Sequence, residues 1–125
     1  MTDTLALLQA VDRLADAVRA LPLSRLRRGV ADEVLALARE LARRAQLLEF
    51  PDREPAELPE VGVFAVGDQL AVAGHDLVMA RRAVAAIPRG GAAGRDGEEG
   101  GTADDPVADD LALVRATARR CGLPC

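Results

Sequence analysis

Residues with side chains suited to catalysis are scarce in this chain of 125 residues. There is one histidine, His75, and one serine, Ser24; the two cysteines are Cys121 and Cys125, and lysine and tyrosine are absent. General acid–base catalysis usually recruits histidine, a carboxylate, lysine, tyrosine or cysteine. A serine nucleophile would require Ser24 and His75 to meet beside a carboxylate, whereas Ser24 is better explained as a helix cap. We therefore expect no catalytic residue and no enzyme activity.

His75 is the only imidazole that could bind a metal. On a helical projection centred on Leu70, Asp68, His75 and Met79 all lie about 140–180° from the core side. Asp68 and His75 are two turns apart, about 10 Å along the axis, which is too far for one metal ion. The sequence also lacks HxxxH, ExxH and CxxC patterns. We expect neither metal nor cofactor, and we interpret Asp68, His75 and Met79 as a solvated face available for partner contact.

The two cysteines close the chain as CGLPC. This spacing is neither a redox CxxC motif nor a prenylation signal, which needs cysteine fourth from the end. Cys121 continues an apolar helical stripe and is expected to be buried, and Cys125 is expected to be exposed. Two reduced thiols suit a cytoplasmic protein, while a disulfide formed on oxidation remains an alternative.

Composition and charge narrow the classes of partner. The formal net charge is −4, and all sixteen basic residues are arginine. An arginine-only basic set is typical of a GC-rich genome, and the acidic balance argues against nucleic-acid binding. The alternative would use two clusters, Arg25, Arg27 and Arg28 in one and Arg43 and Arg44 in the other. No cationic leader is visible, and charged residues interrupt the most apolar stretch, 61–80, so no membrane segment is expected.

Four segments carry apolar residues at alternating spacings of three and four, the pattern of an amphipathic helix. We expect helices over 4–21, 24–49 and 61–87, and a C-terminal helix and tail over 106–125, in which Gly122 closes the helix. Only two or three residues separate the first two, which indicates an antiparallel hairpin. Residues 88–105 are rich in glycine and charge and predict a flexible linker. The fold class is therefore an all-α antiparallel bundle of three long helices (1–87) plus a tethered fourth, which packs in cis or on a partner.

The segment 61–87 allows a second interpretation over 61–75, a β-hairpin turning at Gly67-Asp68. The 3–4 rhythm extends beyond that stretch on both sides and favours a helix. Gly67, Ala71 and Gly74 then form a strip of small residues beside the Leu70 stripe, which would let another helix approach closely. The two glycines do not form a GxGxxG phosphate-binding motif.

The stretch "LPEVGVFAVGDQLAVAGHDL" resembles small actinobacterial all-helical proteins, the CATRA-associated small protein group. The shared features are a proline-rich acidic loop followed by a "VGDQLAVxGHDL"-type helix, within a similar layout over about 5–86. The resemblance implies an accessory component of a bacterial conflict or immunity system that works beside larger partner proteins. It implies no catalytic residues.

These observations favour a non-enzymatic module that binds another protein or itself. The expected contact surface is the outer face with Asp68, His75 and Met79, or the tethered fourth helix. The alternative is a nucleic-acid-associated regulator that uses the arginine clusters of 24–49.

Overall fold

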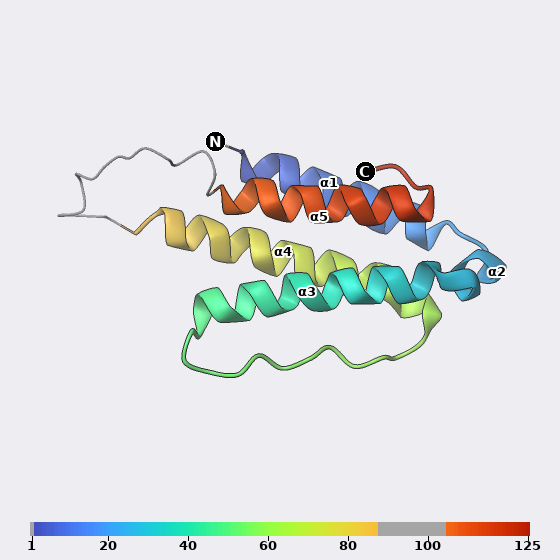
Figure 1. Ribbon diagram of the computed structural model, residues 1–125, viewed down its shortest axis with the longest axis horizontal. Coiled ribbons are helices and arrows are strands. Elements are labelled where there is room, and N and C mark those ends of the chain that lie inside the picture. The colour runs from blue at the N-terminus through green and yellow to red at the C-terminus, as the bar shows by residue number, and fades with distance from the viewer. Residues whose placement is uncertain (1, 88–104) are drawn as a thin grey trace.

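The four apolar stripes form four long helices (Figure 1). These are α1 (Thr4–Arg19), α3 (Ala31–Glu49), α4 (Val66–Ala85) and α5 (Pro106–Cys121). Three short elements precede α3 and α4: α2 (Leu23–Arg25), the π-type turn η1 (Leu26–Val30) and the 3₁₀ turn η2 (Val63–Ala65). This computed structural model describes residues 2–87 and 105–125, so the expected linker lies outside the described residues apart from Asp105. The described residues contain no strand, and the hairpin alternative for 61–75 is wrong.

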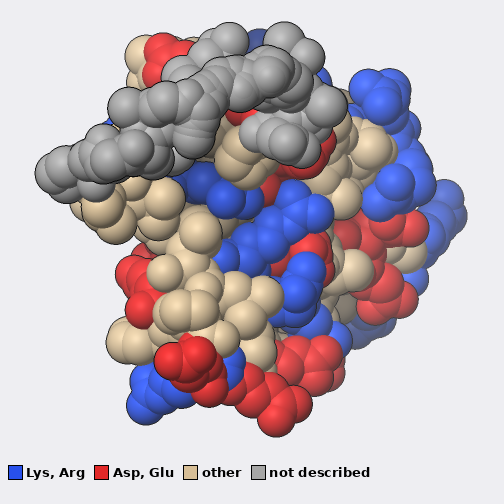
Figure 2. Space-filling model, turned by 60° about the vertical axis from the view of Figure 1, so that its left-hand side comes forward, with Lys and Arg blue, Asp and Glu red and all other residues tan. Residues whose placement is uncertain are grey.

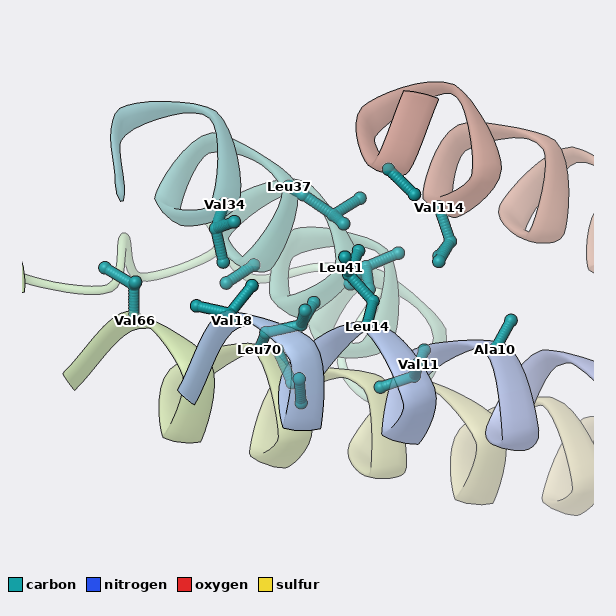
Figure 3. Packing of buried hydrophobic residues seen from close by; sticks show 14 of the residues in the cluster. Ala10, Val11, Leu14, Val18, Val34, Leu37, Leu41, Val66, Leu70 and Val114 are labelled. Atoms are coloured by element: carbon teal, nitrogen blue, oxygen red, sulfur yellow. The ribbon is translucent and has the colours of Figure 1, made fainter. Parts of the chain in front are cut away.

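The core lies where the stripes of all four helices meet (Figure 3). Each helix contributes side chains that are at most 2% exposed. Their burial follows the predicted spacing and stabilises the bundle at roughly 25 cal/mol per Å² of apolar surface removed from water. The most deeply buried members are Leu7, Val11, Leu14 and Val18 of α1, Val34 and Leu41 of α3, Leu70, Leu77 and Val78 of α4, and Val114 of α5.

The arrangement of the helices differs from the expected hairpin. The main contacts of α1 are with α4 and α5, and those of α3 are with the same two helices. Helices α1 and α3 run in opposite directions, as expected, but they lie diagonally across the bundle rather than side by side (Figure 1). Helices α3 and α4 run in the same direction, because the chain between them returns along the whole length of α3. The bundle is all-α, with both parallel and antiparallel neighbours.

The returning segment, 50–62, is held along α3 by side-chain amides and guanidinium groups. The Gln46 amide bonds both the N–H and the C=O of Ala56, each at 2.9 Å. Arg39 Nε donates to the carbonyl oxygen of Leu58 at 2.8 Å, and Gln69 Nε2 of α4 donates to that of Pro59 at 2.8 Å. These bonds supply partners for peptide groups that have no helical partner, and they fix the point where α4 begins.

The expected helix over 24–49 is interrupted before α3 at Gly29, and glycine has a low helix propensity. Gly29 has φ +113°, a conformation that glycine adopts without a steric penalty. The N-cap of α2 is Pro22, and Ser24 lies inside α2 without a side-chain cap bond. The interpretation of Ser24 as a cap is therefore wrong. At the start of α5, Asp105 Oδ1 does cap the helix by accepting from Ala108 N at 3.1 Å.

The fourth helix packs in cis, which the sequence left open. Near its start, Thr2 N donates to Asp105 Oδ2 at 2.7 Å. At its other end, Arg120 Nε bonds Glu33 Oε1 of α3 at 2.9 Å. Leu111, Val114 and Ala118 complete the core between these two ends.

Segment Val63–Ala85 is long and apolar enough to span a membrane by length and composition, and 44% of its apolar window is buried inside the bundle. Its core-facing side chains, including Leu70 and Leu77, are fully buried. The apolar composition of this segment is thus accounted for by a central helix that packs against both α1 and α3.

Candidate functional site

The small residues of α4 lie where this helix approaches α1. A Cβ atom added to Gly74 would lie 2.9 Å from Val11 Cγ2 and 3.1 Å from Val11 Cβ. One added to Gly67 would lie 3.0 Å from Arg19 Cγ and 3.3 Å from the Ala15 carbonyl oxygen. Ala71, between the two glycines, is half-buried against the core. Gly74 in particular admits a valine side chain into space that a Cβ atom would occupy.

Two of the predicted contact residues are engaged by α1. His75 Nε2 lies 2.7 Å from Asp12 Oδ1, and Arg19 Nε lies 2.8 Å from Asp68 Oδ1. The side chains of His75 and Asp68 remain 52% and 74% exposed. Such exposed pairs contribute little to stability. They nevertheless place His75 and Asp68 at the edge of α4 that faces α1, rather than in the middle of its outer face.

The middle of the outer face is apolar. Val72 and Met79 are 62% and 63% exposed, and a separation of seven residues places them two turns apart on one side of the helix. Asp76 lies between them and is exposed. Phe64, 71% exposed, adds an aromatic ring just before α4 begins. Of the three residues predicted for this face, Met79 lies nearest its centre.

A buried ion cluster joins three helices at the end where α3 and α4 finish. Asp110 of α5 is fully buried. Arg81 of α4 binds it with two parallel hydrogen bonds, Nε to Oδ2 at 2.8 Å and Nη2 to Oδ1 at 3.0 Å. Arg44 of α3 adds a third, Nη1 to Oδ1 at 2.7 Å. Forked guanidinium–carboxylate contacts of this kind are the strongest ion-pair geometry in proteins.

The cluster continues to the surface through Glu40. Its carboxylate accepts from Arg44 Nε at 2.7 Å and from Arg43 Nη2 at 2.7 Å. Figure 2 turns this end of the bundle toward the viewer and shows arginine (blue) interleaved with acidic side chains (red). Arg43 and Arg44 are therefore occupied by carboxylates, and Arg25, Arg27 and Arg28 lie at the opposite end of α3. The two arginine clusters do not form one basic surface.

Glu40 predicts a specific pH dependence. Hydrogen bonds, from Arg43 first and then from Arg44, lower the pKa of Glu40 from 4.5 to about 2, against the opposing effect of burial. A depressed pKa in the folded state stabilises the fold above the unfolded pKa, and this contribution is lost as the pH falls from about 4.5 toward 2. We expect Glu40→Gln to cost about 1 kcal/mol at pH 7, with the difference from wild type vanishing near pH 2. Urea unfolding of both proteins between pH 7 and 2 measures this. A constant difference across that range would contradict it.

The cysteines match their expected environments in part. Cys121 is buried and Cys125 is half-buried, and both are free. Burial, together with the nearby Glu33 carboxylate, raises the pKa of the Cys121 thiol, so it behaves as an unreactive core residue. Within residues 2–87 and 105–125, no three His, Cys, Asp or Glu side chains gather in a way that could hold a metal ion.

Sequence reasoning missed Asp110, Arg44 and Arg81 as a unit. A signal was available for Asp110, because it follows Val107 by three residues and precedes Val114 by four, which places it beside the apolar stripe of α5. A carboxylate at such a position requires a buried partner. Its partners are on other helices, so the sequence alone does not identify them.

No protein-family model matches this chain, and comparison with curated proteins and with solved structures found no match.

Proposed function

We propose that this protein is a non-enzymatic binding module whose partner helix lies on the outer face of α4. The observation that carries the proposal is the pair of exposed apolar side chains, Val72 and Met79, on a helix whose other sides are packed in the bundle. Apolar side chains two turns apart on one helix face are the anchors that helix-to-helix recognition uses. Methionine adapts its shape readily and is common at such surfaces.

The charged side chains beside Val72 and Met79 indicate which charges a partner helix would carry. Asp68 and Asp76 flank the apolar positions and are exposed. Arg19 pairs with Asp68, and the exposed Arg82, one turn beyond Met79, bonds only the neutral Thr4 hydroxyl among the residues that the structure describes. An amphipathic helix with an apolar stripe, a basic residue opposite Asp76 and an acidic residue opposite Arg82 therefore fits best. The resemblance to accessory proteins of bacterial conflict systems points in the same direction, toward a larger protein that carries such a helix.

The proposal predicts that Met79→Glu abolishes partner binding and leaves the fold intact. Placing a carboxylate in the desolvated centre of an interface costs several kcal/mol, enough for a loss of a hundredfold or more. The partner is first captured with a photo-crosslinker at position 72, purified, and then titrated by calorimetry with wild-type and variant protein. Ala36→Glu, on an exposed position of α3, is the matched control and should bind like wild type. Equal loss in both variants, or capture of no partner, would contradict the proposal.

The alternative, a nucleic-acid-associated regulator, draws less support. Of its five arginines, Arg43 and Arg44 already bond Glu40, and Arg44 also bonds Asp110. Charges neutralised in this way release few counterions from a phosphate backbone. The three remaining arginines, Arg25, Arg27 and Arg28, lie together at one end of the bundle and do not extend into a longer basic surface.

A further inference from the structure

A pocket of about 340 Å³ opens at the end of the bundle where α3 begins and α5 finishes. Arg25 of α2, Arg28 of η1 and Arg120 of α5 line it, together with one carboxylate, Glu33. Three guanidinium groups and one carboxylate give the pocket a local charge of +2, although the chain as a whole carries −4. The pocket is therefore a positive site on an acidic protein.

Two of these guanidinium groups retain their full charge. Arg25 Nη2 donates to the carbonyl oxygen of Cys121 at 3.1 Å, a neutral acceptor that leaves the positive charge uncompensated. Arg28 has no ion-pair partner within residues 2–87 and 105–125. Arg120 is compensated, because its Nε lies 2.9 Å from Glu33 Oε1. Among the residues that the structure describes, the guanidinium groups of Arg25 and Arg28 thus line one pocket without a carboxylate partner.

The pocket lies on a defined backbone turn, and of its two exposed arginines, Arg25 and Arg28, the first is tied to another helix. Arg28 and Gly29 form the break between two helical segments, with Gly29 at φ +113°. The bond from Arg25 to Cys121 ties the α2 turn to the last turn of α5. A guanidinium group can bind two oxygens of a tetrahedral anion with paired hydrogen bonds.

We propose that this pocket is a binding site for a phosphate group, either free phosphate or a small phosphomonoester. Its occupant neutralises Arg25 and Arg28 and is independent of any partner on the outer face of α4. The size of the pocket suits a small ligand, and its two free charges match a dianion.

The test is a titration of the full chain with inorganic phosphate and, separately, phenyl phosphate, at constant ionic strength, followed by backbone amide NMR. We expect saturable shifts at Gly29, Val30 and Cys121. Tighter binding of phenyl phosphate assigns the site to phosphomonoesters, and equal or tighter binding of inorganic phosphate assigns it to free phosphate. Absence of saturable shifts with both anions would overturn the proposal.

Three variants locate the site. Arg28→Gln should weaken binding about tenfold or more, since it removes a charged hydrogen-bond donor. Arg27→Gln makes the same charge change one residue away, outside the pocket lining, and should alter the affinity less than about twofold. Glu33→Gln should tighten binding, because it removes the only carboxylate and releases Arg120. Equal weakening by Arg27→Gln and Arg28→Gln would mean diffuse attraction and would refute the site.

Discussion

Replacing Asp110 with asparagine should lower the free energy of unfolding by about 3–5 kcal/mol, the usual cost of removing one partner from a buried ion pair. Asp110 is fully buried. The side chains of its partners Arg44 and Arg81 are 27% and 15% exposed. An amide in place of the carboxylate would leave Arg81 without a counter-charge in a region where water cannot replace it. Arg44 would keep Glu40.

Asp109 provides the control for this substitution. It is adjacent in sequence, lies in the first turn of α5, and is exposed. Asp109→Asn should cost less than about 1 kcal/mol, the contribution of a charge near a helix N-terminus. Urea unfolding followed by circular dichroism measures both variants. Similar losses in the two would mean that the cluster around Asp110 adds nothing specific.

A third variant separates the contribution of the Asp110 cluster to folding stability from its role in positioning α5. Asp110→Leu combined with Arg44→Met and Arg81→Met replaces the charges with apolar side chains of similar size, a change that is often neutral or stabilising for buried ion pairs. If the triple variant is as stable as wild type, the cluster acts mainly to set where α5 lies. It joins α5 to the ends of α3 and α4, and it adds to the bonds at the two ends of α5, from Thr2 to Asp105 and from Arg120 to Glu33.

The fold class was accessible from sequence because each helix carries one continuous stripe. In α1, Leu7, Val11 and Leu14 follow the 3–4 spacing, and all three are fully buried. In α4, Val66, Leu70 and Leu77 continue the spacing past the point where a hairpin would turn. An amphipathic helix buries one face, and the spacing of its apolar residues identifies that face. The sequence of a single segment is therefore enough to predict which residues are buried.

The arrangement of neighbours was less accessible. A short connection fixes the relative direction of two helices, but it does not force them into contact. The segment 50–62 carries the chain back along α3, and its anchors, Gln46 and Arg39, bind backbone groups of the segment, with one exposed ion pair from Arg39 to Glu57 at 3.4 Å beside them. Hydrogen bonds from a side chain to a distant peptide leave no spacing pattern in the sequence.

The same limit applies to the charged residues. A helical projection placed Asp68 and His75 on the side of α4 away from the core, and both are exposed. It could not show that Arg19 and Asp12 of α1 would reach them, because that depends on which helix lies beside α4. The small residues were more informative, since Gly67 and Gly74 on one face of a helix predict close approach of a neighbouring helix.

Gly74→Ala tests whether α4 needs glycine at this position to approach α1. The substitution should destabilise the protein by about 1–3 kcal/mol, the usual cost of overpacking a core. This reverses the ordinary effect, because alanine in a helix interior is favoured over glycine by about 1 kcal/mol. The added Cβ would lie 3.1 Å from Val11 Cβ, an atom fixed to the backbone of α1, so rotation of the valine side chain cannot relieve the contact. The two helices must move apart instead.

Gly67→Ala is the matched comparison, and it should change the stability by no more than about 1 kcal/mol. Its Cβ would meet Arg19 Cγ at 3.0 Å, in a flexible side chain that is 42% exposed and able to move. The gain in helix propensity offsets the remaining contact, 3.3 Å from the Ala15 carbonyl oxygen. Adding Val11→Ala to Gly74→Ala should cost less than the sum of the two single changes by more than about 1 kcal/mol, because alanine at position 11 lacks both Cγ atoms that the new Cβ would meet and only the 3.1 Å contact with the Cβ of residue 11 remains. Additive costs would mean that Gly74 and Val11 do not share the contact, and that α4 needs glycine there for a reason other than its approach to α1.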